Sequence, residues 1–391
     1  MRYIFFTLLI STFASGYAQS GQAGLSDSGF YYIQNISLDT ENGIPRTKPA
    51  IILREMSLKS GTSILKAQLN QKLKENEERL MNLRLFNQVT VSPSSTAVTD
   101  TLDLIVKVTE RFPIMPDVNF EFADRNFNVW WKEQNHDLRR INLGLTLNHN
   151  NFRGNRETLG VTVQAGYTQK MGISYSRPFA DKNQKHGFGF SIFGLQNREI
   201  AYMTDTNKLQ FLRSDDNFMQ RRLDAAVWYT YRPEYAVTHS LRLAFHHYWI
   251  SDTIVKLNPE YLGQGKTQED VLQLTYRLEY NGVDNWNYPL VGQRFIGVFD
   301  QKLAMLSGKW QSSLHLHYDR YFNPFPKWYG SIVARVRGSI PQQQPYIFRQ
   351  NLGYEFDYIR GYEYYVIDGS SFGMLRANIK RELLNVRVKL P

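Results

Sequence analysis

The stretch Thr158–Tyr167 (TLGVTVQAGY) alternates between two kinds of side chain at every position. Its odd-numbered positions, from Leu159 to Tyr167, are apolar or aromatic, and its even-numbered positions are threonine, glycine and glutamine. Successive side chains of a strand point to opposite faces, so an extended segment of this kind has one apolar and one polar face. Leu272–Tyr280 repeats the pattern, which recurs with polar turns between runs from about Val118 onward.

The length of these runs and the position of the aromatic residues separate the pattern from that of a water-soluble sandwich. Runs of about ten residues with aromatic residues at their ends are typical of strands that cross a bilayer. Such end residues are Trp228, Tyr229, Tyr231, Tyr248, Trp249, Trp328 and Tyr329. The sequence therefore predicts a mainly β protein, a transmembrane antiparallel β-barrel of about 12 strands that is apolar outside and polar inside.

The N-terminus indicates export. Arg2 is followed by the apolar run Tyr3–Ile10 and by small residues that end at Ala18, which predicts a signal peptide over residues 1–18. The apolar run is too short for a helix that must cross about 30 Å of hydrocarbon. The chain has no cysteine, which excludes disulfides, thiolate catalysis and a cysteine-linked lipid anchor.

Charge and motifs indicate neither nucleic acid binding nor catalysis. The formal net charge is +10, but Lys and Arg are spread along strands and loops, so a basic lumen or contact with anionic headgroups is the better explanation. The chain contains no nucleophile-elbow, zinc-protease, phosphate-loop or dinucleotide motif. His315, His317 and Asp319 share one face of a predicted strand, a spacing that is ordinary in a wet lumen. We expect no enzyme activity, no cofactor and no metal.

Residues 26–112 follow a different pattern and predict a small two-layer α+β domain. Arg111–Pro116 (RFPIMP) is a proline-rich linker that leads from this domain into the barrel. The expected elements are a strand over Tyr31–Ser37, a helix capped by Thr47 with Pro49 in its first turn, a helix over Ser63–Leu83, and strands over Gln88–Val91 and Leu102–Val108.

This segment resembles a POTRA domain, the periplasmic module of the BamA/TamA family of outer-membrane assembly factors. The similar sequences are IILREMSLKSG (51–61), LMNLRLFNQVTV (80–91) and DLIVKVTER (103–111). At the junction between the second helix and the next strand, we expect Leu85, Phe86 and Val89 to lie in the core rather than on a binding surface.

The barrel region, residues 117–391, carries three further similarities to this family. NFRGN (151–155) resembles the turn between the second and third barrel strands, and EYNGVDNWNYPLVG (279–292) resembles a signature between the eighth and ninth. Ile359, Arg360, Gly361 and Tyr362 match a tetrapeptide at the tip of a long loop that folds back into the lumen. The resemblance implies that Arg360 meets an acidic partner on the lumen wall.

One feature departs from the family pattern. The family's barrel closes with about 16 strands, whereas the sequence supplies about 12 and no final strand with a terminal aromatic residue. An open sheet edge leaves unpaired amides in hydrocarbon. The sequence is therefore expected to be a truncated or fragmentary member, and the acidic partners of Arg360 are expected in the absent strands.

The resemblance implies a protein of the bacterial outer membrane with its N-terminal domain in the periplasm. The implied function is insertion or translocation of other outer-membrane polypeptides, without a cofactor. The implied partners are the outer-membrane bilayer, unfolded outer-membrane protein clients and periplasmic accessory proteins, with no nucleic acid. Two alternatives remain open: an outer-membrane channel for solutes, and a structural barrel protein without insertase activity.

Overall fold

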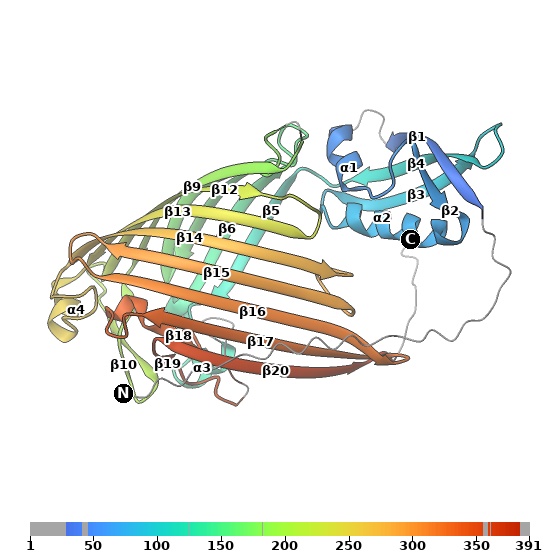
Figure 1. Cartoon of the computed structure of the whole chain (residues 1–391). Helices are drawn as coiled ribbons and strands as arrows, with labels where there is room; N and C mark the ends of the chain where they lie inside the picture. Colours follow the sequence, from blue (N-terminus) through green and yellow to red (C-terminus); the bar gives the residue numbers. More distant parts are fainter. Residues whose placement is uncertain are drawn as a thin grey trace, which may run out of the picture.

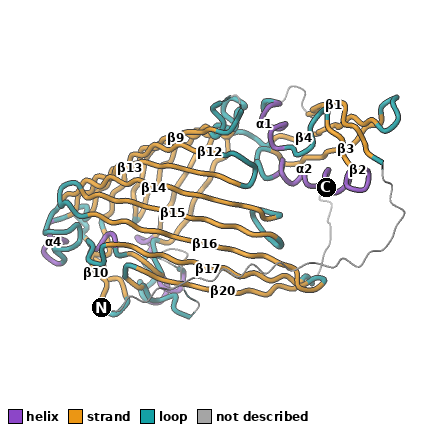
Figure 2. Tube along the Cα trace, viewed as in Figure 1, coloured by secondary structure: helices purple, strands orange, loops and turns teal. Residues whose placement is uncertain are grey.

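The chain folds into a small N-terminal domain and a large curved antiparallel sheet that meets the domain at one end (Figure 1). The computed structural model describes residues 29–40, 46–124, 126–181, 183–354, 359 and 361–383. The predicted signal peptide lies outside these residues, as does Arg360. The trace coloured by secondary structure shows that helices are confined to the small domain and to the opposite end of the sheet (Figure 2).

The N-terminal domain is a four-stranded sheet covered by helices. Its strands follow the order β2-β1-β4-β3, in which β1 and β4 are parallel and the other pairs are antiparallel. Its elements are β1 Phe30–Thr40, α1 Pro49–Glu55, β2 Thr62–Leu65, a 3₁₀ turn Lys66–Gln68, α2 Leu69–Met81, β3 Phe86–Ser95 and β4 Thr101–Glu110.

Three details differ from the sequence-based expectation. Strand β2 was not expected, and the second helix begins at Leu69 instead of Ser63. Thr62 and Ile64 are β-branched, and Ile64 joins the core when the segment pairs with β1. The predicted cap by Thr47 is also wrong: Lys48 occupies the N-cap without a side-chain bond, and the Thr47 hydroxyl accepts a hydrogen bond from Asn151.

The core of the small domain lies between α2 and the sheet. Leu69, Leu73 and Leu80 of α2 are buried at helical spacing, which gives the helix one apolar face. Phe86 is fully buried, and Leu85 and Val89 are 8% exposed, so the structure places all three junction residues inside this core.

Twelve antiparallel strands form the large sheet, in the order β20-β17-β16-β15-β14-β13-β12-β9-β8-β7-β6-β5. The number agrees with the sequence-based prediction. The strands are β5 Ile114–Phe122, β6 Ile141–Asn150, β7 Thr158–Gly166, β8 Thr168–Arg177, β9 His186–Asn197, β12 Gln220–Tyr231, β13 Val237–Ile250, β14 Gln268–Val283, β15 Gly292–Ala304, β16 Trp310–Phe325, β17 Trp328–Ile340 and β20 Ser371–Arg381.

One face of this sheet is apolar and exposed. Val163 pairs with Leu145 and Met171 on the neighbouring strands, and its side chain is 58% exposed. The opposite face carries polar pairs, such as the Thr146 and Thr162 hydroxyls, which are 3.1 Å apart. Rows of exposed apolar side chains over a whole sheet need an apolar surrounding, and a bilayer supplies it. The polar face is therefore the lumen side.

Short elements gather at the end of the sheet that lies away from the N-terminal domain (Figure 1). They are α3 Phe127–Lys132, a 3₁₀ turn Leu138–Arg140, the hairpin β10 Glu199–Asp205 and β11 Lys208–Arg213, α4 Asp252–Leu257, a 3₁₀ turn Tyr346–Phe348, β18 Gln350–Leu352 and β19 Ile367–Asp368. Within the described ranges, no helix is long and apolar enough to cross a membrane.

The two end strands of the large sheet, β5 and β20, each pair on one side only within the described part of the chain. β5 runs away from the N-terminal domain, and β20 runs back toward it, so the two free edges are antiparallel in direction. Free backbone groups on such edges can pair with another strand.

We predict that residues 26–112 fold as a separate unit in which Phe86→Ala lowers the free energy of unfolding by about 3–5 kcal/mol, because the fully buried ring leaves a cavity. Urea unfolding followed by circular dichroism measures this change. Phe30→Ala is the matched control because Phe30 is 56% exposed. Equal losses for the two variants would contradict the core assignment.

Candidate functional site

The N-terminal domain contacts the end of the large sheet through an aromatic side chain of the sheet's turns. Phe179, in the turn between β8 and β9, is 4% exposed and packs as a member of the small domain's hydrophobic core. The Arg54 guanidinium of α1 lies 4.4 Å from the centre of this ring. The turn thus inserts an aromatic side chain into the neighbouring domain, which fixes the two parts against each other.

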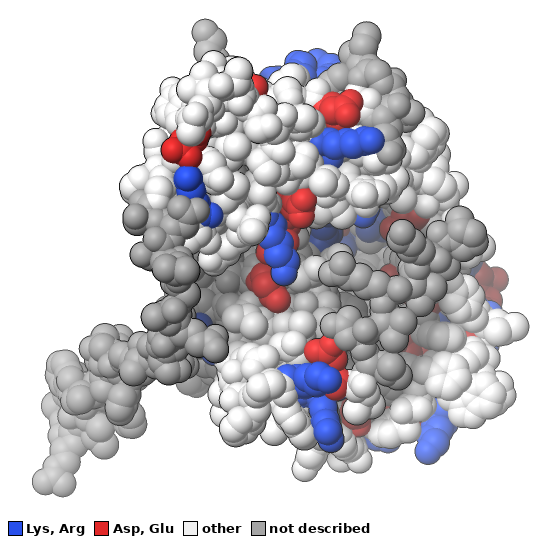
Figure 3. Space-filling model, turned by 90° about the vertical axis from the view of Figure 1, so that its right-hand side faces the viewer, with Lys and Arg blue, Asp and Glu red and all other residues white. Residues whose placement is uncertain are grey.

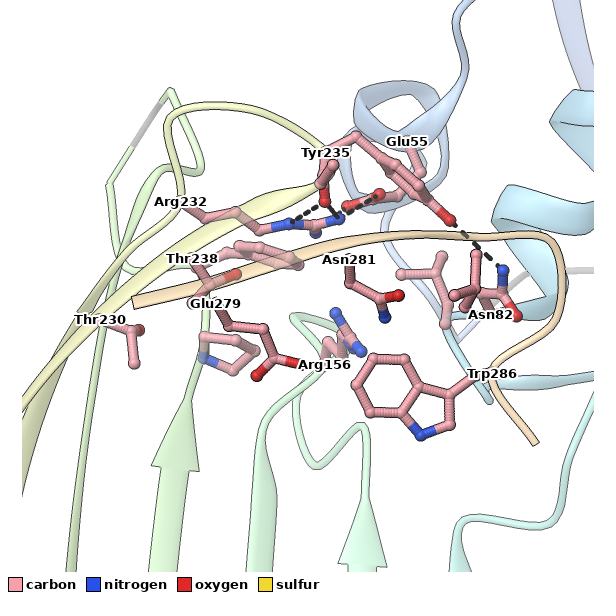
Figure 4. Close-up of a pocket in the computed structure, with 15 residues that line it drawn as sticks. Glu55, Asn82, Arg156, Thr230, Arg232, Tyr235, Thr238, Glu279, Asn281 and Trp286 are labelled. Atoms are coloured by element: carbon pink, nitrogen blue, oxygen red, sulfur yellow. Dashed lines mark hydrogen bonds and ion pairs between the residues drawn. The ribbon is translucent and has the colours of Figure 1, made fainter. Parts of the chain in front are cut away.

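A buried carboxylate lies beside this contact. Glu55, at the end of α1, is 3% exposed, and Arg232, just after β12, donates two hydrogen bonds to it at 2.7 and 3.1 Å. Arg54 adds a third at 2.6 Å. Burial lowers the pKa of Arg54, and the neighbouring Glu55 opposes this shift. Figure 4 shows Arg232 between Glu55 and Tyr235, whose carbonyl oxygen also accepts from Arg232.

The turn between β6 and β7, which matches the family-like sequence NFRGN, makes a second contact. The Asn151 amide donates to the Thr47 hydroxyl at 2.8 Å, and the Lys48 N–H donates to the Gly154 carbonyl at 2.9 Å. Gly154 has a φ of +75°, and a Cβ at this position would lie 2.2 Å from the Arg46 carbonyl oxygen. Glycine is therefore required here by both the backbone conformation and the close approach.

Two further contacts join the end of α2 to the loops of the large sheet. The Asn82 amide donates to the Tyr235 hydroxyl at 3.3 Å, and the Arg79 guanidinium lies 4.6 Å from the centre of the Tyr235 ring. Arg84 donates to Asn287 at 3.3 Å and lies 5.6 Å from the Trp286 ring. With the two turns described above, four separate loops of the sheet thus hold the small domain.

Two larger cavities of the described residues lie in this junction. One, of about 290 Å³, is lined by Glu55, Asn82, Leu83, Arg156, Pro178, Phe179, Thr230, Arg232, Tyr235, Ala236, Thr238, Glu279, Asn281, Val283 and Trp286. The other, of about 450 Å³, shares Leu83, Arg156 and Pro178 with the first. The exposed surface around the junction carries basic and acidic side chains beside one another (Figure 3).

The lumen wall carries rows of paired charges. Glu279 accepts from Arg277 on its own strand at 2.8 Å and from Arg294 on β15 at 3.0 Å. His246 faces Asp224 across β12 and β13 at 2.6 Å. His315, His317 and Asp319 lie on β16 as expected, and no group of three or more His, Asp or Glu side chains in the described ranges is arranged to hold a metal ion.

The loop that carries the predicted tetrapeptide lies at the far end of the sheet. Ile359 and Tyr362 are 41% and 58% exposed, and Gly361 has a φ of +85°. Beyond the tetrapeptide, the Val366 N–H donates to the Asn207 carbonyl at 2.8 Å, which joins the loop to the β10–β11 hairpin. Arg360 lies outside the described residues, so its predicted role stays a prediction.

Several residues that build these contacts were not singled out from the sequence. Phe179 lies in a turn, outside the alternating pattern of the strands. An apolar residue at such a position was the only hint in the sequence that it packs against another part of the chain. Glu55 and Arg232 carry no local signal because they are 177 positions apart. At the far rim, buried Arg140 pairs with Asp124 at 2.7 Å and with Glu199, and it was missed for the same reason.

The fold and the junction define a class of protein: an outer-membrane-type β-barrel sheet preceded by a small domain docked at one end. Residues 31–111 match the family described as "POTRA: Surface antigen variable number repeat". This segment is therefore a POTRA domain, and the fold of the chain, a POTRA domain followed by a barrel-type sheet, is similar to that of solved outer-membrane barrels.

Two solved structures share this architecture. The chain is similar to BamA from Haemophilus ducreyi lacking POTRA domains 1–3, with 15% identity, a TM-score of 0.50, and 89% of this chain and 66% of that chain covered. It is also similar to CdiB from Escherichia coli, with 12% identity, a TM-score of 0.50, and 91% and 63% covered.

These similarities concern the fold. The chain spans about two thirds of the length of the two solved chains. A search of curated protein sequences found no match.

We predict that Glu55→Gln destabilises the docked arrangement by about 3–5 kcal/mol, because it leaves the largely buried Arg232 guanidinium without its counter-charge. The double variant Glu55→Gln/Arg232→Gln should recover part of this loss. Hydrogen exchange of α1 and the β12–β13 turn measures the effect in the whole protein. Glu78→Gln is the control, because Glu78 pairs only loosely with Lys74, at 3.9 Å. Additive effects of the two junction substitutions would contradict direct coupling.

Proposed function

We propose that this protein inserts or translocates polypeptides at the bacterial outer membrane, with the POTRA domain in the periplasm and the large sheet in the bilayer. One observation carries the proposal: a POTRA domain is held against one end of a twelve-stranded sheet whose outer face is apolar. Proteins of similar fold include BamA and CdiB. The assigned parts are a signal peptide over residues 1–18, the POTRA domain over 26–112 and the barrel over 117–391.

Strand addition at a sheet edge is the proposed mechanism. A client strand exchanges one set of backbone hydrogen bonds for another, so little free energy is lost when it moves between edges. Strand β5 pairs only with β6 in the described part of the chain, and we propose that its other edge receives the client strand. The apolar face beside this edge then receives the client's own apolar face within the bilayer.

The β3 edge of the POTRA sheet is poorly suited to strand addition. β3 is one of the two outer strands, the other being β2, and the Val91 N–H of β3 donates to the Glu77 carboxylate of α2 at 2.9 Å. Because Val91 donates to Glu77, its N–H points away from β4, and the alternation of a strand gives Pro93 the same direction. Proline has no N–H to donate. The middle of this edge is therefore closed to strand addition, and the accessory or client contacts of the domain are assigned to its other surfaces.

Arg360 completes the proposal. By resemblance to the family, Ile359, Arg360, Gly361 and Tyr362 tip a loop in which the guanidinium pairs with a carboxylate of the lumen wall. In a protein that also carries the strands with its expected acidic partners, we expect Arg360→Ala to reduce insertion activity, and Arg360→Lys to restore it only partly because lysine lacks the planar fork. In the 391-residue chain we expect the same substitution to have little effect.

Insertion activity is measured with the protein in liposomes and an unfolded barrel client, whose folding is followed by protection from protease. The proposal predicts faster client folding than in empty liposomes. Client folding at the rate of empty liposomes would overturn it. The alternative, a solute channel, predicts instead steady conductance in a planar bilayer without any effect on client folding.

A second prediction concerns location. The protein expressed with its N-terminus intact should fractionate with the outer membrane and migrate faster in gels before boiling than after, because a hydrogen-bonded barrel sheet resists unfolding by detergent. Recovery from the soluble periplasmic fraction, with identical migration before and after boiling, would contradict the assignment of the sheet to the bilayer.

A further inference from the structure

Arg156 has an unusual position in the junction between the POTRA domain and the barrel. It belongs to the turn between β6 and β7, outside the membrane-spanning strands, and it lines both junction cavities. Figure 4 shows its guanidinium directed into the first cavity, in the space between Glu279, Asn281 and Trp286. The Phe179 ring centre lies 5.7 Å from this guanidinium.

No carboxylate of the described residues forms an ion pair with Arg156, because the nearby ones are engaged elsewhere. Glu55 is bound by Arg54 and Arg232. The next acidic residue along the chain, Glu157, is fully buried against Arg153 at 2.9 Å and Arg177 at 3.4 Å. Glu279, which lines the first cavity, is bound by two arginines of the lumen wall.

The surroundings of Arg156 increase the need for a counter-charge. Burial lowers the pKa of Arg156 to about 10, and the positive charge of Arg232 contributes to the same shift. The side chain nevertheless stays protonated at neutral pH. Arg84 and Arg111 line the second cavity with Arg156, and none of the described residues that line it is acidic. Arg156 is partly buried, and a cation that is partly removed from water without a counter-charge is costly; an anion that enters the cavity lowers that cost.

We infer that the junction cavities bind a carboxylate of a polypeptide segment, with Arg156 as its principal contact. The inference rests on the proposed function, since it names the group of a client that this site recognises. A polypeptide fits better than a free anion because apolar and aromatic surface borders the charge: Leu83 and Pro178 line both cavities, and Trp286 lines the first. The two adjoining volumes, about 290 and 450 Å³, give room for a side chain and its flanking backbone.

Binding of two matched peptides tests the inference. The probes are a short amidated, fluorescently labelled peptide that carries a single Glu and the same peptide with Gln, each titrated with the whole protein in detergent micelles and followed by anisotropy. Wild type should bind the Glu peptide at least about tenfold more tightly, the gain of one charge-assisted hydrogen bond or more. Arg156→Gln should abolish this preference, and Arg156→Lys should keep part of it.

Arg221→Gln is the matched control. Arg221 is exposed at the far end of β12 and forms no ion pair in the described part of the chain, so its loss changes the net charge equally without touching the junction. It should leave the preference intact. Equal binding of both peptides to wild type, or a preference that survives Arg156→Gln, would overturn the inference. Acetate that displaces the Glu peptide at a concentration equal to that of the peptide would show that the site binds any small anion. This result would also overturn the inference.

The outcome is separable from that of the proposed function. Client folding in liposomes does not require a preference for a carboxylate. Insertion activity without a preference for the Glu peptide would therefore refute the Arg156 site and leave the proposed function standing. Peptide preference without insertion activity would instead leave a polypeptide-binding site on a protein of another function.

Discussion

The structure depends on the requirement that every backbone N–H and C=O within hydrocarbon be hydrogen-bonded inside the protein. Twelve antiparallel strands meet this requirement along their shared edges, and the alternation of side chains then decides which face meets lipid. Val163 and Met171 lie side by side on the exposed apolar face, while Thr146 and Thr162 pair on the other. A register shift of one residue would exchange the two faces, so the apolar pattern also fixes the register.

At the rim of the sheet the chain leaves the hydrocarbon, and polar and charged side chains form hydrogen bonds and ion pairs there. Next to the POTRA domain, the turns after β8 and β12 supply Phe179 and Arg232, one to an apolar core and one to a buried carboxylate. Arg156 also lies in this arginine-rich junction. It lines both cavities and has no ion-pair partner among the described residues. Docking and anion recognition thus arise from one feature, an excess of cationic side chains where the two parts meet.

The sequence predicts what is local and periodic. Alternation predicted about 12 strands, and helical spacing predicted the second helix of the small domain, since both depend on neighbours along the chain. Strand β2 was missed because four residues carry too little pattern, and Thr47 was misread as a cap because its hydroxyl contacts Asn151, 104 positions away. The Glu55–Arg232 pair and the insertion of Phe179 could not be predicted, because each depends on how two separate units meet.

The central claim is that the alternating face of the sheet meets lipid, and site-directed spin labels test it most directly. Labels placed singly at consecutive positions of β7, from residue 159 to residue 165, are measured in bilayers for collision with oxygen, which dissolves in lipid, and with a water-soluble nickel complex. The account predicts that oxygen contact is high at 159, 161, 163 and 165 and that nickel contact is high at 160, 162 and 164. Equal contact at all positions, or the opposite alternation, would contradict it.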